Sequence, residues 1–180
     1  PEEGAEGLSG DKENALFRCL DWQVKPQEKV ALLGPSGAGK TTLLNLLERF
    51  WDVSEGRIIL AGQDIRSLSE SGLRSLLGYI GPQNHIFADS IRNNLLMAQG
   101  AASDEDCWQA LACAALDERI KELPHGLDTL LGAGGIELSG GERKRLFVAQ
   151  LVLQNAPIWL VDEPTEGLDY VTEQEVLACL

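Results

Sequence analysis

The feature that most constrains this sequence is the stretch at 34–41, GPSGAGKT, which fits the pattern G-x-x-x-x-G-K-[ST]. An apolar run typical of a buried strand, Val30–Leu33, precedes it, and leucines at helical spacing follow it in Thr42–Phe50. A strand, a glycine turn and a helix together form the context in which this pattern binds phosphate. Glycines let backbone N–H groups approach phosphate oxygens, and the positive end of the following helix adds to the attraction. The stretch therefore predicts a site for a nucleoside triphosphate.

Two residues of this predicted site have distinct chemistry. We expect the ammonium group of Lys40 to lie along the β- and γ-phosphates and the hydroxyl of Thr41 to ligate Mg²⁺. The alternative, a glycine turn without a ligand, is disfavoured by the flanking elements. The complete set of predicted nucleotide-binding residues is Gly34, Pro35, Ser36, Gly37, Ala38, Gly39, Lys40, Thr41 and Thr42.

Composition narrows the class of protein. A chain of 180 residues is the size of one domain with a substantial core. Its net charge of −13 disfavours a nucleic-acid surface, which needs a basic patch. No apolar run approaches the roughly eighteen residues that a membrane span requires. The cysteines are scattered, so we interpret Cys19, Cys107, Cys113 and Cys179 as reduced thiols rather than as disulfides or a zinc site.

Strand-like and helix-like patterns alternate along the chain. The alternation predicts an α/β fold, with a mainly parallel sheet flanked by helices and a small antiparallel sheet at its edge. The expected strands are Ala15–Val24, Val30–Leu33, Arg57–Leu60, Gly78–Gly81 and Ile158–Val161, with a turn at Ala61–Asp64. The expected helices are Thr42–Phe50, Leu68–Leu77, Ser90–Ala98, Asp104–Leu116, a turn at Asp117–Leu123, one from Ser139 to about Leu153, and one that begins near Asp169.

Two adjacent carboxylates follow the apolar strand at Ile158–Val161, at the strand end where ligands of α/β proteins bind. Adjacent strand residues point to opposite faces, so Asp162 and Glu163 cannot share one task. We expect Asp162 to hold the magnesium shell and Glu163 to polarise an attacking water. General-base assistance of that kind contributes roughly 10²–10⁴ in rate. The alternative for Glu163 is a solvated strand end.

A second anion site is indicated by the sequence SGGE at 139–142. A serine followed three residues later by a glutamate is a capping box, which satisfies two N–H donors at a helix start. A helix N-terminus with two glycines also favours a bound anion. The basic triplet at 143–145, RKR, lies on the same helix and is compatible with a solvated face.

Taken together, these motifs resemble the ATP-binding-cassette (ABC) family. There an L-S-G-G-[QE] signature, here at 138–142, precedes a hydrophobic strand with D-E and a loop ending in L-D, here at 168–169. The resemblance implies that the nucleotide is ATP, with Mg²⁺, and that Lys40 and Glu163 are catalytic. It also implies a P-loop NTPase fold in a single domain over 1–180. Within this domain a RecA-like core would span 14–83 and 146–180, and a helical subdomain would span 84–145.

The resemblance assigns roles that depend on a partner. Gln83 would contact the magnesium shell together with Thr41 and Asp162, and would link it to a transmembrane domain. Two cassettes would sandwich two nucleotides, because the signature of one molecule would face away from its own phosphate loop. Asp169 would lie at the seam of this dimer. The residues expected to bind the partner's nucleotide are Leu138, Ser139, Gly140, Gly141 and Glu142.

The interval between phosphate loop and signature is similar to the exporter type. Tyr79–Gln83 matches its Q-loop and Ile91–Leu95 the helix that follows, whereas coiled-coil ATPases of DNA repair insert long heptad arms there. Glu166-Gly167, with the stretches at 51–52, 94–98 and 131–135, is similar to the CydC half of heterodimeric bacterial thiol exporters. That resemblance implies cysteine or glutathione export for cytochrome bd assembly, at the cytoplasmic face of the inner membrane.

Several family features are absent from the sequence. No aromatic residue precedes the first expected strand to stack on adenine, and no switch histidine follows Glu163; His85 and His125 lie in other loops. We therefore expect a fragment that lacks its membrane domain and is nearly inactive alone. Ala133 and Gln150 also replace residues common in exporters. Two alternatives stay open: a low-activity regulatory half of a heterodimeric lipid- or drug-type exporter, and a soluble cassette protein acting on nucleic acid.

Overall fold

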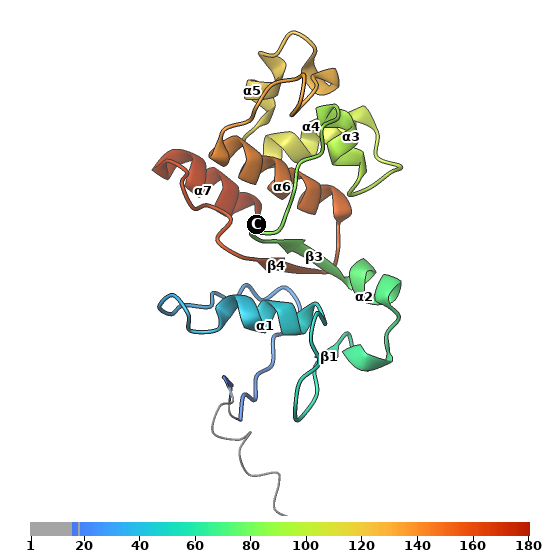
Figure 1. Ribbon diagram of the computed structural model, residues 1–180, viewed down its shortest axis with the longest axis vertical. Coiled ribbons are helices and arrows are strands. Elements are labelled where there is room, and N and C mark those ends of the chain that lie inside the picture. Colours follow the sequence, from blue (N-terminus) through green and yellow to red (C-terminus); the bar gives the residue numbers. More distant parts are fainter. Residues whose placement is uncertain (1–15, 18) are drawn as a thin grey trace, which may run out of the picture.

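The computed structural model describes residues 16–17 and 19–180, in which a small parallel sheet lies between two helical layers (Figure 1). The sheet pairs β3 (Leu77–Ile80) with β4 (Ile158–Val161). Helix α1 (Lys40–Leu47) lies on one side and α6 (Gly140–Gln154) on the other. This arrangement places the start of α1 beside the end of β4, where the predicted site is expected.

The remaining elements surround this centre. They are the strands β1 (Ile59–Leu60) and β2 (Gln63–Asp64), the helices α2 (Glu70–Leu76), α3 (Ile91–Leu96), α4 (Asp104–Cys113), α5 (Asp117–Lys121) and α7 (Tyr170–Cys179), and the 3-10 helices η1 (Ile65–Ser67) and η2 (Gly126–Asp128). Serine or aspartate side chains accept N–H groups at the starts of α2, α3, α4, α6 and α7, which explains why these helices begin where they do. Over the described part of the chain, no helix combines the length and apolarity needed to cross a membrane.

The parallel register confirms one part of the predicted sheet. Leu77 pairs with Ile158 and Ile80 with Val161, and the N–H of Asp162 extends the ladder to the Ile80 carbonyl at 2.8 Å. Both faces of this pair are covered. Leu111 and Leu146 belong to the core cluster on the α6 side, and Leu44, Leu77 and Leu160 to the cluster on the α1 side. Burial on both faces explains why the two strands read as continuous apolar runs.

The small antiparallel sheet is a hairpin. Strands β1 and β2 flank a two-residue loop, Ala61-Gly62, in which φ is 49° and 80°. Two consecutive positive φ angles match the twist of a tight hairpin, and glycine adopts such angles without strain. The expected turn at Ala61–Asp64 was therefore too long, because Gln63 and Asp64 form a strand.

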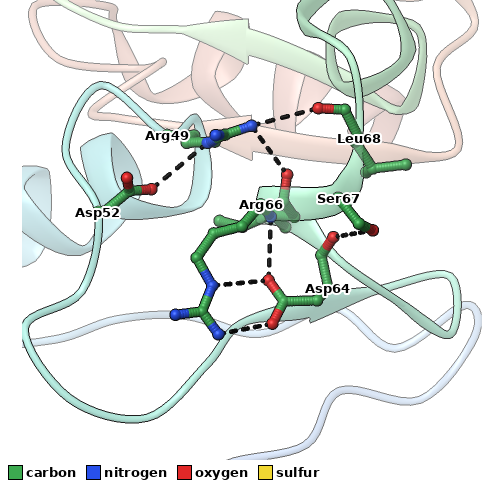
Figure 2. A network of polar contacts seen from close by, with 7 residues as sticks. Arg49, Asp52, Asp64, Arg66, Ser67 and Leu68 are labelled. Carbon is green, nitrogen blue, oxygen red and sulfur yellow. Dashed lines mark hydrogen bonds and ion pairs between the residues drawn. The ribbon is translucent and has the colours of Figure 1, made fainter.

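Arg49 ties the end of α1 to this hairpin region (Figure 2). Its guanidinium donates to the carbonyls of Ile65 and Leu68, each at 3.2 Å, and pairs with Asp52 at 3.4 Å. The neighbouring Asp64 accepts from Arg66, whose hydrogen bonds lower the pKa of Asp64 to about 2. Polar contacts thereby tie together the segment from the end of α1 to the end of η1.

Two predicted strands do not form. Residues 16–17 and 19–24 have no strand, while Ala15 and Arg18 lie outside the described residues. Val30–Leu33 is also irregular, and Leu33 is 92% exposed. The physical reason is that a strand needs a hydrogen-bonded neighbour. Among the described residues β4 pairs with β3 alone, so the apolar run before the phosphate loop has no ladder partner.

The prediction of four reduced thiols was wrong for one pair. Cys113 at the end of α4 and Cys179 at the end of α7 form a disulfide, with their Cα atoms 5.4 Å apart. Packing of α4 against α7 brings together residues separated by 66 positions. Sequence spacing carries no signal for such a pairing. Cys19 and Cys107 are free.

We predict that reducing this disulfide destabilises the folded chain. A cross-link over 66 residues restricts the unfolded ensemble, and loop-closure entropy gives a contribution of up to about 4 kcal/mol. Thermal unfolding of oxidised protein with and without dithiothreitol measures this. The Cys113→Ser variant should unfold at the lower temperature in both conditions. Equal unfolding temperatures for oxidised and reduced wild type would contradict the prediction.

Candidate nucleotide-binding site

The phosphate loop has the backbone shape that its glycines permit. Gly37 and Gly39 have φ of 81° and 92°, a conformation that disfavours other residues. A Cβ on Gly39 would also lie 2.9 Å from the side chain of Leu16 and 3.0 Å from that of Phe17. Gly39 contributes no side-chain cap to α1, so the first N–H groups of that helix are not satisfied by a capping side chain. Such a helix start attracts an anion.

The side chain of Lys40 folds back onto the phosphate loop. Its ammonium group donates to the carbonyl of Gly34 at 2.8 Å and to that of Pro35 at 3.0 Å. These bonds hold the positive charge at the mouth of the loop, within reach of the space that phosphates would enter. Since three donors are available on an ammonium group, phosphate oxygens can compete for it without removing every loop contact.

Two predicted magnesium ligands lie in direct contact. The hydroxyl of Thr41 donates to a carboxylate oxygen of Asp162 at 2.7 Å. The first turn of α1 therefore meets the end of β4, as the sequence predicted. A hydroxyl beside a carboxylate fits the preference of Mg²⁺ for hard oxygen donors, so Thr41 and Asp162 would hold the ion.

A cavity of about 830 Å³ connects the motifs. The phosphate loop, Asp162 and Glu163 line it together with Gly140 at the start of α6. We expected the signature to face away from its own phosphate loop, yet Gly140 borders the same cavity as Lys40. Its action on a partner's nucleotide stays a prediction. Asn84, which the sequence reasoning missed, also lines the cavity and accepts the N–H of Gly81 at 2.9 Å.

The predicted capping box is present at the start of α6. Ser139 accepts the N–H of Glu142 at 3.2 Å, and Glu142 accepts the N–H of Ser139 at 2.8 Å. Arg119 donates to Glu142 at 2.8 Å. Partial burial alone would raise the pKa of Glu142, but the hydrogen bonds from Ser139 and Arg119 lower it below its usual value. The signature loop is therefore anchored by a charged carboxylate.

Two other predicted residues, Gln83 and Asp169, do not line this cavity. Gln83 lines a second hollow of about 360 Å³ with Tyr79, Phe87 and Met97, so its contact with the magnesium shell stays a prediction. Asp169 caps α7, accepting the N–H groups of residues 171 and 172, each at 3.1 Å. Its place at a dimer seam stays a prediction.

Lys144 is a further residue that the sequence reasoning missed. The sequence of the basic triplet at 143–145 is compatible with a solvated face. In the structure, Lys144 instead donates to the carbonyl of Glu163 at 3.3 Å and to the carboxylate of Glu166 at 2.8 Å. The spacing of 19 and 22 residues carries no signal for these contacts, which exist because α6 packs beside the loop after β4.

Glu48, at the opposite end of α1 from the phosphate loop, is an unexpected titratable group. It caps the end of α1, and one of its carboxylate oxygens is buried without a hydrogen-bond partner. Burial, opposed by the charge of Arg74, raises its pKa from 4.5 to about 7. Glu48 and Asp162 in turn add to the effect of burial in raising the pKa of Tyr79.

The known proteins that this chain resembles are transporters. The family model described as ABC transporter matches residues 17–166. The glutathione/L-cysteine transport protein CydC of Escherichia coli is 39% identical over all 180 residues, and a lipid A-core flippase of Methylobacillus flagellatus is 44% identical over 164. The chain spans 30% and 28% of the length of these two relatives.

Relatives of another cargo class are equally similar. The mitochondrial iron-sulfur clusters transporter ATM1 of Yarrowia lipolytica is 43% identical over 150 residues, which are 83% of this chain and 21% of that protein. The solved structure of a bacterial Atm1-family ABC exporter with ATP bound is 41% identical. It covers 81% of this chain and 26% of the exporter chain, with a TM-score of 0.76.

We predict that Glu48→Gln stabilises the protein at alkaline pH. Because the folded-state pKa of about 7 lies above the unfolded value, wild type binds an extra proton on folding between about pH 4.5 and 7 and loses stability as pH rises through that window. The neutral amide removes this loss. Its unfolding temperature should exceed that of wild type by roughly 2 °C or more at pH 8, and by less at pH 5. Glu105→Gln, an exposed change on α4, is the control, and parallel pH profiles for all three proteins would contradict the prediction.

Proposed function

We propose that this chain binds MgATP and hydrolyses it to drive an exporter. The chain belongs to the ABC transporter family, as an exporter-type ATP-binding domain, and proteins of this family hydrolyse ATP to power transport. The observation that carries the proposal is the cavity shared by Lys40, Thr41, Asp162 and Glu163. It combines a phosphate cradle, a pair of magnesium ligands and a base at the end of one strand. The chain spans less than a third of the length of these relatives, so the transport activity of the whole protein is part of the proposal.

The residues divide the reaction between them. Lys40 and the N–H groups at the start of α1 bind the phosphates and stabilise the charge on the transferring phosphoryl group. Thr41 and Asp162 hold Mg²⁺, which when bound neutralises charge on the phosphate oxygens. Glu163 orients the attacking water and accepts its proton. The acceptance of a proton by Glu163 requires a carboxylate at this position.

A second cassette completes the proposed ATP-binding site. The start of α6 offers two glycines and the N–H groups of a capped helix, which suit the γ-phosphate of a nucleotide held by a partner. We propose a dimer of cassettes, a hetero- rather than a homodimer, attached to transmembrane domains at the cytoplasmic face of a bacterial inner membrane. Gln83, in the hollow with the exposed Phe87 and Met97, would transmit closure to those domains.

For the cargo we propose cysteine or glutathione. The support is the CydC relative, whose similarity extends over the whole of this chain, and the pair Glu166-Gly167 after the catalytic strand. Lipid A-core flippases and ATM1 transporters are alternatives of similar identity.

The hydrolytic proposal predicts that Glu163→Gln in the full-length transporter lowers ATP turnover by roughly 10²-fold or more while ATP binding is retained, because the amide cannot accept the proton. Lys40→Ala should instead weaken ATP binding itself. Steady-state phosphate release and binding of a fluorescent ATP analogue separate the two effects. Glu105→Gln serves as the matched control. Turnover of Glu163→Gln at the wild-type rate would remove Glu163 from the catalytic role.

The cargo proposal predicts ATP-dependent uptake of radiolabelled glutathione or cysteine into inside-out vesicles that contain the full-length transporter. The Glu163→Gln variant should abolish uptake because the transport cycle then lacks hydrolysis. ATP hydrolysis that responds to lipid A and not to thiols, without thiol uptake, would contradict this cargo and favour the flippase alternative.

A further inference from the structure

Lys144 lies where the signature helix meets the loop that follows β4. It stands in the second turn of α6, and its side chain is 27% exposed. The ammonium group donates to the backbone carbonyl of Glu163 at 3.3 Å and to the carboxylate of Glu166, at 2.8 Å. One cation therefore bonds both ends of the turn at 163–166.

The backbone of Glu163 is in an unusual conformation. Its φ is +51°, a left-handed value that non-glycine residues adopt only where the surroundings hold them. The Glu163 carbonyl accepts from the N–H of Glu166 at 3.4 Å as well as from Lys144. Two donors from different parts of the chain therefore meet at one carbonyl, and both distances are longer than that of a typical N–H···O bond.

Contacts on either side hold the same loop in place. A Cβ on Gly141 of α6 would lie 2.9 Å from the side chain of Leu168, so this leucine side chain packs against the start of α6. On the other side, Thr165 donates to Glu173 of α7 at 3.0 Å. The loop is fixed at 165 and 168 by these contacts, and Lys144 supplies the corresponding contact at 163 and 166.

We propose that Lys144 is a positioning residue that holds the backbone of Glu163, and with it the carboxylate that orients water, while Glu166 holds Lys144 in place. The inference rests on the proposed ATP hydrolysis. It differs from the reading of Lys144 as one partner of a surface ion pair, because such pairs contribute little and would leave turnover unchanged. It also differs from direct contact between Lys144 and phosphate, which is a third possibility since Lys144 lines the cavity.

The test uses the full-length transporter with its partner cassette. Lys144→Met should lower kcat for ATP hydrolysis about tenfold, because a displaced catalytic group loses rate steeply. The KM for ATP should change less than about twofold, since Lys40 and the phosphate loop are untouched. Lys144→Arg keeps the donors and should retain most of the turnover. Lys121→Met is the matched control, because it removes exposed ion pairs to Asp117 and Glu118 on α5.

Two further variants separate the carbonyl contact from the ion pair. Glu166→Gln removes the charge but leaves the Lys144 bond to the Glu163 carbonyl, so it should lower kcat less than Lys144→Met does. The double variant Lys144→Met with Glu166→Met removes both charges of the ion pair and also the ammonium donor to the Glu163 carbonyl. It should therefore fail to recover turnover, and full recovery would overturn the proposal.

The remaining outcomes are distinct. Wild-type kcat in Lys144→Met, or an equal loss in Lys121→Met, would overturn the positioning role. A raised KM with unchanged kcat would overturn it in favour of direct phosphate binding. If wild type does not hydrolyse ATP, or Glu163→Gln does so at the wild-type rate, the proposed function itself fails. Unfolding temperatures measured on every variant show whether a loss of turnover reflects a loss of folded protein.

Discussion

The hydrogen bond between Thr41 and Asp162 is the contact on which the site depends. It joins residues 121 positions apart, at the start of α1 and the end of β4. Without this contact the phosphate loop would carry a lysine and an uncapped helix start, but no carboxylate. With it, the donors that attract phosphate and the oxygens that suit Mg²⁺ line one cavity. The charge of −13 over the whole chain makes such local concentration of positive groups necessary for binding a polyanion.

The packing around β3 and β4 keeps this contact in place. One apolar cluster joins the strands to the α1 side, through residues such as Leu44 and Leu160. The larger cluster joins them to α6 and to the helices beyond it. Hydrogen bonds add to this apolar packing. Gln150 of α6 donates to the backbone carbonyl of the fully buried Asn94 at 2.7 Å and so holds α3 against α6. This contact accounts for a glutamine at 150 structurally, where the sequence alone offered no role for it.

The sequence predicts best where the chemistry is local. The glycine turn before α1, the capping box at Ser139 and the carboxylates after an apolar strand are each contained within a few residues, and the structure contains all three. The failures share one cause, which is dependence on distant neighbours. Val30–Leu33 has the composition of a strand but no ladder partner, and Cys113 meets Cys179 only because α4 and α7 pack together. Lys144 belongs to the same class, since its contacts exist only once α6 lies beside the loop after β4.

The most direct test of this account is the effect of Mg²⁺ on ATP affinity in the full-length protein. A fluorescent ATP analogue is titrated with and without Mg²⁺ into wild type, Thr41→Ala and Asp162→Asn. If the two side chains form one magnesium site, Mg²⁺ tightens binding to wild type, and either substitution removes that increment while binding without Mg²⁺ is retained. An undiminished effect of Mg²⁺ in both variants would contradict the central claim that this contact builds the site.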